Sequence, residues 1–539
     1  MRRIKSVGDC IRGRVKSPDQ GAAQKKEKRL SEFFTTTMTN DQSQDIVSIA
    51  RAARIASTAL QSVTTQHKSE ALFRIREVLE QRRDQVFEAN RLDKQLAEKQ
   101  VAQGILSSSL FARLDITGGS KYDTILAGLA DVVALPDPSN RVTLATRLDN
   151  GLDLYRVSCS VGVLLTIFEA RPEVVVNISA LALKSGNAVI LKGGKEAIHT
   201  NAALADAIRE ALASLPEGNP VPRDAVQIVE TREEISALLE LDRYIDLVVP
   251  RGSNSLVKYI QNNTRIPVLG HADGLCSVYI DKDADVDKAV RVAVDSKEII
   301  TYQMAAIPNY RLNNVCTSAR GSHKLISSHQ TTYPAACNSA ETLLLHSSLL
   351  SPSSSILHRL ATAFFESSVH LRCDPPTLAA LEQLFPADTP FSSFFTPSVS
   401  DDYDTEFLAL VMAVRAVQSV EEAVEHVNEH GSKHTDAIVT EDERVANYFM
   451  TRVDAAGVFW NASTRFSDGF RYGFGAEVGV STNKTHARGP VGLEGLVIYK
   501  YRIHGNGHAT ADYSGSGANA RKFLHEVIPE AEYKVEGRR

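Results

Sequence analysis

Several features that would assign the chain to a special class are missing from it. No run of about 18 apolar residues occurs, so no membrane span is expected. The six cysteines show neither paired nor Cys-x-x-Cys spacing, which argues against a disulfide framework and against a zinc or other metal site, and favours a reducing, cytoplasmic compartment. A net charge of −5 at pH 7 creates no general basic field, so we expect no nucleic-acid binding outside the N-terminal segment.

Residues 1–44 differ in composition from the rest of the chain. They are rich in lysine and arginine and have little apolar periodicity. A mitochondrial presequence is disfavoured because Asp9, Asp19 and Glu27 interrupt the basic segment and no good amphipathic face forms. We expect either a disordered tail or an upstream start codon, with Met38 as the true first residue.

The central part of the chain has the pattern of an α/β protein with a large core. Amphipathic helices are predicted over residues 44–99, and a β-hairpin over 139–157, where apolar and polar residues alternate across Asn150-Gly151. Buried strands at 161–168, 187–191, 226–229 and 245–249 are each followed by a helical stretch, which indicates a parallel sheet flanked by helices. A second alternating lobe is predicted after residue 337, with a strand over 406–417.

These strands are not followed by any Gly-x-Gly-x-x-Gly motif, so a nucleotide would have to be held by another arrangement. The strand at 187–191 ends in Lys192-Gly193-Gly194-Lys195, and such a turn can bring backbone amides and a lysine to a phosphate or a ribose. An ordinary tight turn with two solvated lysines fits the spacing equally well.

Cys337 is the candidate nucleophile. Pro334 disfavours helix in the residue before it, and the residues from Ala335 onward are good helix formers. We therefore expect Cys337 in or beside the first turn of a helix, whose unpaired amides would favour a thiolate and hold an oxyanion. A small buried hydrophobe is the alternative interpretation of an isolated cysteine.

A series of longer motifs is spread between about residues 45 and 505. They include Phe168-Glu169-Ala170-Arg171-Pro172, Leu191-Lys192-Gly193-Gly194-Lys195, Val249-Pro250-Arg251-Gly252, Leu269-Gly270-His271, Lys433-His434-Thr435-Asp436 and Asn461-Ala462-Ser463-Thr464-Arg465. Together they resemble the gamma-glutamyl phosphate reductase family, also called glutamate-5-semialdehyde dehydrogenases, of the aldehyde dehydrogenase superfamily. The resemblance implies an α/β fold with a parallel-sheet cofactor domain, an α/β catalytic domain and a small β oligomerisation flap.

The resemblance also implies a reaction, in which NADPH reduces L-glutamate 5-phosphate to the 5-semialdehyde with release of phosphate, in proline biosynthesis. Cys337 would attack the acyl phosphate and form a thioester, with the oxyanion held by its own amide and by Asn338. Lys192 matches the superfamily lysine at the adenosine ribose, and Glu406 the glutamate at the nicotinamide ribose. The other residues implied for cofactor binding are Gly193, Gly194, Pro250, Arg251 and Gly252.

Charge and motif together suggest substrate contacts for four residues, Arg171, Arg465, His486 and Arg488. The implied partners are the small-molecule substrate, a second copy of the chain in a homo-oligomer, and the glutamate 5-kinase that makes the unstable substrate.

Two other functions compete with this one. An oxidising aldehyde dehydrogenase needs a base that activates water, normally a glutamate, but the matching stretch contains His271, which favours the acyl phosphate chemistry. A catalytically inactive chain that keeps the fold is the second rival, because of an atypical segment just before Cys337.

That segment, residues 298–330, has no counterpart in the family pattern, which is restored when Lys297 is joined to Thr331. We expect a retained in-frame intron in the gene model and a low-order excursion in which Cys316 is not catalytic. A genuine insertion that loops into solvent is the alternative, because loop-closure cost grows slowly with length.

After the N-terminal extension of residues 1–44, the expected organisation has three parts. Residues 45–270 form the NADPH-binding domain, with the hairpin 147–157 in the flap; residues 275–499 form the catalytic domain; and residues 500–539 supply a flap strand and the tail. The hairpin should pair with residues 497–503 and pack on another subunit, because a lone hairpin is only marginally stable.

Overall fold

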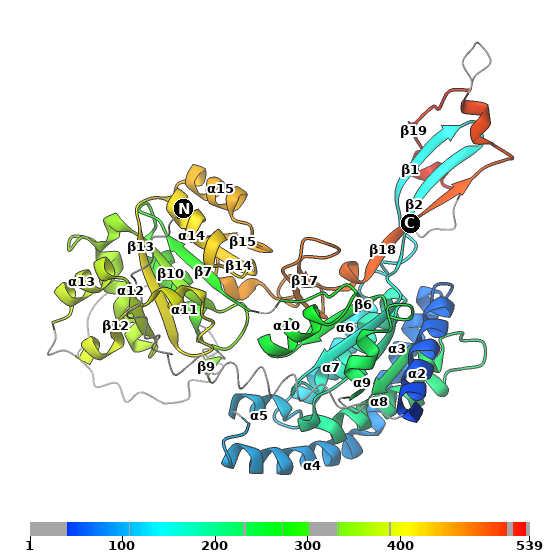
Figure 1. Ribbon diagram of the computed structural model, residues 1–539, viewed down its shortest axis with the longest axis horizontal. Coiled ribbons are helices and arrows are strands. Elements are labelled where there is room, and N and C mark those ends of the chain that lie inside the picture. The colour runs from blue at the N-terminus through cyan, green and yellow to red at the C-terminus, as the bar shows by residue number, and fades with distance from the viewer. Residues whose placement is uncertain are drawn as a thin grey trace, which may run out of the picture.

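The computed structural model describes residues 40–106, 108–229, 233–271, 273–300, 331–332, 334–386, 390–514 and 521–534. Two α/β lobes lie side by side, and a narrow β flap projects away from the first of them (Figure 1). Among the helices of the described residues, none combines the length and the apolar character that a bilayer span requires.

The first lobe contains a parallel four-stranded sheet in the order β5-β4-β3-β6, covered by helices. Its strands are predominantly apolar, and β3 and β4 are buried along their whole length, as expected for strands covered on both faces. The predicted amphipathic helices and buried strands are confirmed. The elements are α2 Asn40–Leu60, α3 Thr65–Gln81, α4 Arg83–Ala102, α5 Ser108–Leu114, α6 Lys121–Ala134, β3 Val163–Phe168, α7 Glu173–Ser185, β4 Ala188–Lys192, α8 Ile198–Ala213, β5 Val226–Val229, α9 Glu233–Leu239, β6 Leu247–Arg251 and α10 Asn254–Asn262.

Two polar side chains, those of Asn187 and Asp246, hold this sheet together. Gly162, just before β3, donates from its N–H to the Asn187 side-chain oxygen, and the Asn187 amide donates to the carbonyl of Leu496. The carboxylate of Asp246 accepts from the N–H of Val163 at 2.7 Å and pairs with Arg54. These polar residues are therefore explained by the architecture, since buried backbone groups need partners.

The second lobe is built on a seven-stranded sheet in the order β12-β11-β13-β10-β7-β14-β15, in which every neighbouring pair is parallel. The predicted strand over 406–417 is shorter than expected and begins at Val411, so that Glu406 lies in the loop before it. The elements are β7 Cys276–Ile280, α11 Val286–Lys297, β10 Ala340–His346, α12 Ser355–Glu366, β11 His370–Cys373, α13 Pro375–Leu384, β12 Phe395–Pro397, β13 Val411–Val417, α14 Val420–His430, β14 Thr435–Val439, α15 Glu443–Arg452 and β15 Gly457–Trp460.

After β15 the chain returns to the first lobe. The short strands β16 Gly479–Ser481 and β17 Gly489–Val491 form an antiparallel pair, and the buried side chains of Val478, Leu493 and Leu496 belong to the first lobe's core. The sequence analysis placed this stretch in the catalytic domain, whereas its apolar residues pack with the cofactor lobe. The return brings residues 477–480 next to the loop that connects the two lobes.

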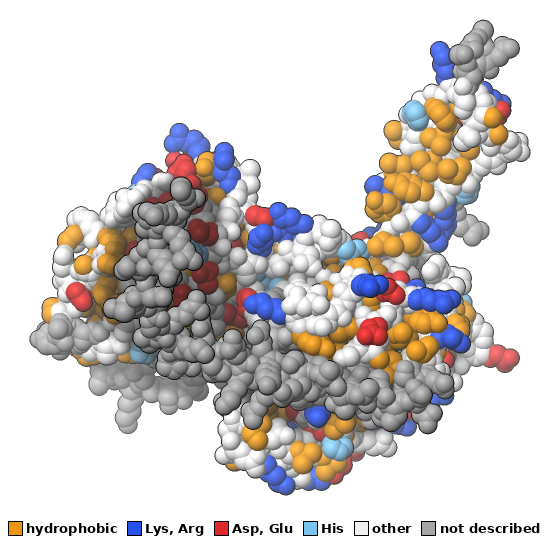
Figure 2. Space-filling view, viewed as in Figure 1, with side chains coloured by type: hydrophobic (Ala, Val, Ile, Leu, Met, Phe, Trp, Pro, Cys, Tyr) orange, Lys and Arg blue, Asp and Glu red, His pale blue; other side chains and the backbone are white. Residues whose placement is uncertain are grey.

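The flap is an antiparallel sheet in the order β18-β2-β1-β19, made of β1 Val142–Asp149, β2 Leu152–Ser160, β18 Val497–His504 and β19 Glu526–Val527. The hairpin and its pairing with 497–503 are present as predicted. One face packs on the C-terminal segment through Tyr155, Val157 and Ile528. Hydrophobic side chains remain visible along the projecting arm (Figure 2).

The atypical segment leaves and re-enters the second lobe at one place. Two short strands, β8 Ile299–Ile300 and β9 Thr331–Thr332, pair antiparallel, with Ile299 opposite Thr332 and Ile300 opposite Thr331. Residues 301–330, on which the predictions of a low-order excursion and of a non-catalytic Cys316 rest, lie outside the described residues.

Candidate active site

Cys337 lies in a tight turn immediately before β10, the central strand of the second sheet. The prediction of a helix after Pro334 is wrong. Residues 340–345 are buried between β7 and β13, and the strand hydrogen bonds to both neighbours outweigh a weak local preference for helix. A helix dipole therefore cannot be what stabilises a thiolate at Cys337.

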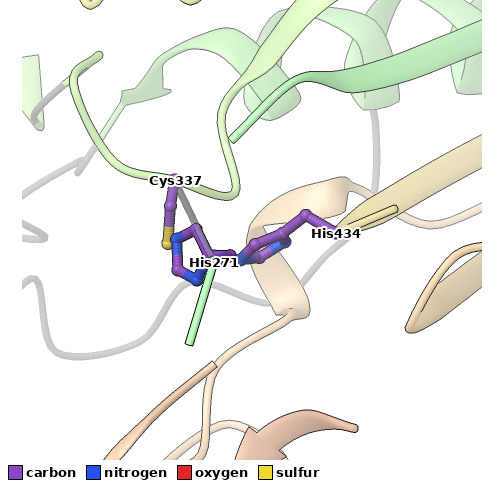
Figure 3. A group of neighbouring side chains, drawn as sticks. All are labelled: His271, Cys337 and His434. Atoms are coloured by element: carbon purple, nitrogen blue, oxygen red, sulfur yellow. The ribbon is translucent and has the colours of Figure 1, made fainter. Parts of the chain in front are cut away.

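Two histidines supply that stabilisation instead. The side chains of Cys337, His271 and His434 converge (Figure 3), and one ligand atom of each lies within 4.8 Å of the others. Burial by itself would raise the pKa of the Cys337 thiol, but His434 and His271 together hold the pKa well below its usual value. The thiolate in turn raises the pKa of His271 to about 9, against the lowering effect of burial. The pair is thus a thiolate beside an imidazolium.

The orientation of each imidazole is set by its second nitrogen. Nδ1 of His271 lies 2.9 Å from the carbonyl oxygen of Val480, which can only accept, so Nδ1 carries a proton and Nε2 is left for Cys337. Nδ1 of His434 lies 3.0 Å from Oγ1 of Thr435. The His434 ring is fully buried, and its Nε2 has no hydrogen-bond partner in the described part of the chain.

The backbone of the cysteine turn is held from several sides. Sγ of Cys276 donates to the carbonyl of Cys337 at 3.3 Å, and Oγ1 of Thr464 donates to the carbonyl of Asn338 at 2.7 Å. A Cβ placed on Gly274 would lie 2.3–2.7 Å from the Cys337 backbone. Only glycine fits this close approach, and the turn has little freedom to move.

Asn338 and Arg465, two predicted site residues, serve this turn. Nη1 of Arg465 donates to Oδ1 of Asn338 at 2.6 Å and to Oγ of Ser339 at 2.8 Å. The Asn338 amide donates to the carbonyl of Ser467 at 3.0 Å and, at longer distance, to that of Arg465. The expected oxyanion donor is thus engaged in holding the turn. Within the described residues, the N–H of Cys337 itself donates to no other group.

Two arginines interact electrostatically with Cys337, and a third interacts with both of them. Burial and the charges of Arg251 and Arg113 lower the pKa of Arg171 to about 10, while Glu173 and the Cys337 thiolate oppose this shift. The pKa of Arg113, near the end of α5, is lowered mainly by burial. The charge of Arg251 lowers it further, and the charge of Cys337 raises it. Arg113 and Arg171 therefore lie close enough to interact with the thiolate, and Arg251 lies close enough to interact with both of them. Such an arrangement suits a ligand with more than one negative charge.

The residues predicted for the cofactor lie at the carboxyl ends of neighbouring parallel strands. Lys192 closes β4 and is followed by Gly193 and Gly194, whereas Pro250 and Arg251 close β6. Carboxyl ends of parallel strands meet at one edge of a sheet, which is where α/β proteins bind nucleotides. A Cβ at Gly252 would lie 2.6 Å from the Glu169 carboxylate, whose Oε2 also accepts the N–H of Ser253, so the loops after β3 and β6 are tied together.

Two members of this set lie on the side of the site where Cys337 is found. Arg251, expected with the cofactor, lies among the cations around Cys337, 3.9 Å from the Glu477 carboxylate. Glu406 accepts the N–H of Gly274 at 3.1 Å, and burial raises the pKa of its carboxyl group. Gly274 also packs against the backbone of Cys337, so a single residue lies between Glu406 and the cysteine turn.

His486 and Arg488, predicted to contact the substrate, are occupied elsewhere. Nε2 of His486 bonds to the carbonyl of Gly495 at 2.7 Å, and Arg488 donates to the carbonyl and the carboxylate of Asp454 at 3.0 Å. Among the described contacts, none joins either residue to Cys337. His486 therefore contacts the returning segment itself, and Arg488 contacts the loop before β15.

Sequence reasoning did not assign site roles to His271, His434, Arg113 and Gly274. His271 and His434 lie within the motifs given above, so both histidines could have been proposed from the sequence as site residues. Arg113 and Gly274 offer no such signal, because only packing brings them to Cys337.

The sequence and the fold have clear counterparts among known proteins. The model of the "Aldehyde dehydrogenase family" matches residues 19–307. An acetylating aldehyde dehydrogenase from Geobacillus thermoglucosidasius has the same fold, with a TM-score of 0.54 at 16% identity, over 87% of this chain and 98% of that one. The class is therefore that of the aldehyde dehydrogenases.

More similar relatives narrow the class. A probable gamma-glutamyl phosphate reductase of Schizosaccharomyces pombe is 48% identical over 89% of this chain and 96% of its own length. The gamma-glutamyl phosphate reductase of Saccharomyces cerevisiae is 44% identical over 89% of this chain and 97% of its own length. The crystal structure of the Thermotoga maritima enzyme of that name has a TM-score of 0.73 at 33% identity and covers 86% of this chain and 99% of that one. The chain belongs to the gamma-glutamyl phosphate reductase family.

Proposed function

We propose that the protein catalyses the NADPH-dependent reduction of L-glutamate 5-phosphate to L-glutamate 5-semialdehyde and phosphate, in proline biosynthesis. The observation that carries the proposal is the Cys337 thiolate, which lies beside His271 and His434 and interacts electrostatically with Arg113 and Arg171. A nucleophile next to several cations suits an acyl phosphate, whose phosphate and carboxylate are both anionic.

The first chemical step needs a nucleophile and a place for negative charge. The thiolate of Cys337 attacks the acyl carbon, the C–S bond forms, and the bond from that carbon to the phosphate oxygen breaks, so that phosphate leaves with the electron pair. The arginines offset the charge of the departing phosphate. The N–H of Cys337, which has no other acceptor among the described residues, is placed to receive the developing oxyanion.

The second step returns the cysteine to its starting state. NADPH supplies a hydride to the carbonyl carbon of the thioester. Collapse of the resulting thiohemiacetal breaks the C–S bond and releases the aldehyde, while Cys337 leaves as a thiolate beside the His271 imidazolium. Because Nδ1 of His271 is held by the carbonyl of Val480, its Nε2 keeps facing the sulfur through both steps.

The residues at the edge of the first sheet fit the cofactor. Lys192 and the following glycines at the end of β4, and Gly252 after β6, lie where α/β folds hold a dinucleotide. Glu406, tied to Gly274 beside the cysteine turn, is the group we assign to the end of the cofactor that must approach the thioester.

One experiment separates this function from its rivals. The purified protein, given the semialdehyde and NADP⁺, should form NADPH only when inorganic phosphate is present, and Cys337→Ser should abolish this activity. Oxidation that proceeds without phosphate would instead identify a hydrolytic aldehyde dehydrogenase. An intact fold without turnover and without labelling of Cys337 by an acyl phosphate mimic would identify an inactive chain.

We also infer that the protein is a homo-oligomer assembled through the flap. Tyr499, Tyr501 and Ile503 of β18 share a face of the flap sheet with Leu144 and Val527, and all five are exposed. The opposite face is already covered by the C-terminal segment. β18 is moreover an edge strand, so its free side and its apolar face are both available to a second copy of the chain.

The oligomer is tested by the molar mass in solution. Light scattering after size exclusion should give a multiple of the chain mass of 58.8 kDa. Tyr501→Lys with Ile503→Asp should lower that mass. A monomeric wild-type protein would refute the assembly.

A further inference from the structure

The side chains of His271, Cys337 and His434 form a set of donor atoms that suits a zinc ion. Zinc prefers thiolate sulfur and imidazole nitrogen in a tetrahedral arrangement, and these three residues offer one sulfur and two nitrogens within 4.8 Å of one another (Figure 3). Cysteine spacing had argued against a zinc site, but spacing detects only ligands that are close in sequence. Here, the ligands come from three separate segments.

In both imidazoles the second ring nitrogen is hydrogen-bonded to an oxygen, as is usual for zinc-binding histidines. A metal-binding histidine normally donates its other ring N–H to an oxygen, which fixes the ring and the tautomer. Nδ1 of His271 is hydrogen-bonded to the carbonyl oxygen of Val480, and Nδ1 of His434 is hydrogen-bonded to Oγ1 of Thr435. Each ring thereby leaves Nε2 for the centre of the group.

The Nε2 atom of His434 gives independent evidence for a bound ligand. The residue has no solvent-exposed surface, and its Nε2 has no hydrogen-bond partner within the described part of the chain. A buried polar atom without a partner costs free energy, and a bound cation would remove that cost.

We propose that Zn²⁺ binds reversibly to Cys337 Sγ and the Nε2 atoms of His271 and His434, with a water or an anionic group of the substrate as fourth ligand, and thereby blocks the nucleophile. Binding forms three protein–zinc bonds and releases the proton of the His271 imidazolium, with no oxidation or reduction. The thiolate lone pair is then bound to the metal and cannot attack a carbonyl. The inhibitory effect rests on the proposed function, whereas the binding rests on the geometry alone.

Cobalt(II) provides a test of binding that needs no catalysis. In the full-length protein without nucleotide, Co²⁺ should give a thiolate-to-cobalt charge-transfer band, which Zn²⁺ abolishes by competition. Cys337→Ser should remove the band, and His271→Gln should weaken binding by at least the roughly 10–100-fold that loss of an outer-shell partner costs. His434→Gln should do the same, but His271→Gln is the safer variant because His434 lies wholly inside the protein.

Matched controls separate this site from other cysteines. Cys276 lies 3.9 Å from Nδ1 of His434, so Cys276→Ser tests whether the neighbouring thiol is the ligand instead. Cys159→Ser removes a distant, partly exposed thiol. Both control proteins should keep the band. A band that survives Cys337→Ser, one that disappears with Cys276→Ser, or no band in the wild-type protein would overturn the proposal.

The inhibitory arm uses the same proteins. Free Zn²⁺ should reduce the phosphate-dependent activity to the level of Cys337→Ser, and a chelator should restore it. A protein that shows the cobalt band but no turnover would retain the metal site while the proposed function fails. Full activity with zinc bound would refute the inhibition.

Discussion

The backbone of Gly274 packs directly against the backbone of Cys337. A Cβ at position 274 would lie 2.3 Å from the carbonyl oxygen and 2.5 Å from Cα of the cysteine, both closer than real Cβ contacts come. The same glycine donates its N–H to the Glu406 carboxylate. One residue therefore links the nucleophile to a group assigned to the cofactor.

Gly274→Ala should lower kcat/KM strongly, because the added methyl group must push the Cys337 turn aside. A displacement of about 1 Å can cost on the order of a hundredfold in rate. Steady-state kinetics measure the loss, and the melting temperature reports whether the fold survives. Gly118→Ala is the matched control, since a Cβ there meets only the Asp115 side chain at ordinary distance. Equal kinetics for the two variants would contradict the expected displacement.

His271→Gln should raise the pKa of the Cys337 thiol. The imidazolium lowers that pKa against the effect of burial, so its removal leaves the thiolate with less support. In the wild-type protein, alkylation by iodoacetamide should remain fast at pH values well below the usual pKa of a thiol, because the thiolate persists down to its depressed pKa. In the variant, the midpoint should move to higher pH. The control is His430→Gln, because His430 pairs with Asp404. An unchanged midpoint in His271→Gln would contradict the prediction.

Lys192→Ala should raise KM for NADPH more than it changes kcat. A contact to the adenosine end is made equally in the ground state and the transition state, so it contributes uniform binding. Lys195→Ala, which removes an exposed lysine from the same turn, is the control. The prediction fails if KM for NADPH is the same in Lys192→Ala as in the wild-type protein.

Asp436→Asn should flatten the dependence of stability on pH. Burial raises the pKa of Asp436 from 3.8 to about 7, although the N–H of Ser277 donates to its carboxylate. The folded state therefore binds an extra proton between these values. The stability that this proton contributes is fully present below pH 3.8 and is lost as pH rises through about 7, with a slope of at most about 1.4 kcal/mol per pH unit.

Urea unfolding at several pH values between 5 and 8 measures this slope in both proteins. The variant's free energy of unfolding should fall less steeply with rising pH, whatever its absolute value. Parallel curves for Asp436→Asn and the wild-type protein would show that the carboxyl group does not titrate in this range.

Deleting residues 298–330 should increase kcat/KM. Ile300 and Thr331 are opposite one another in an antiparallel pair, so the chain leaves and re-enters the second lobe at one place, a few residues after Lys297. Joining Lys297 to Thr331 restores the family pattern immediately before the cysteine turn. Kinetics of the shortened protein test the effect, and sequencing of the transcript tests the origin. An abundant message that encodes the segment, together with full activity of the longer protein, would defeat the expectation.

Local sequence determined most of the secondary structure of this protein. The buried strands β3 and β4 are continuous apolar runs, and the alternation across Asn150-Gly151 specified the flap hairpin. Helix α15 begins directly after Asp442, because the Asp442 side chain caps its first turn. Such features arise from interactions between residues a few positions apart.

Tertiary structure alone decided the environment of Cys337. The residues after the cysteine prefer helix locally, but the hydrogen bonds to β7 and β13 and the burial of both faces make them a central strand. The thiolate is consequently stabilised by His271, from the connection between the lobes, and by His434, from the start of β14. Packing between two sheets and a returning segment, which are far apart in the chain, brings these groups together. The residue pattern of any single stretch therefore could not predict the site.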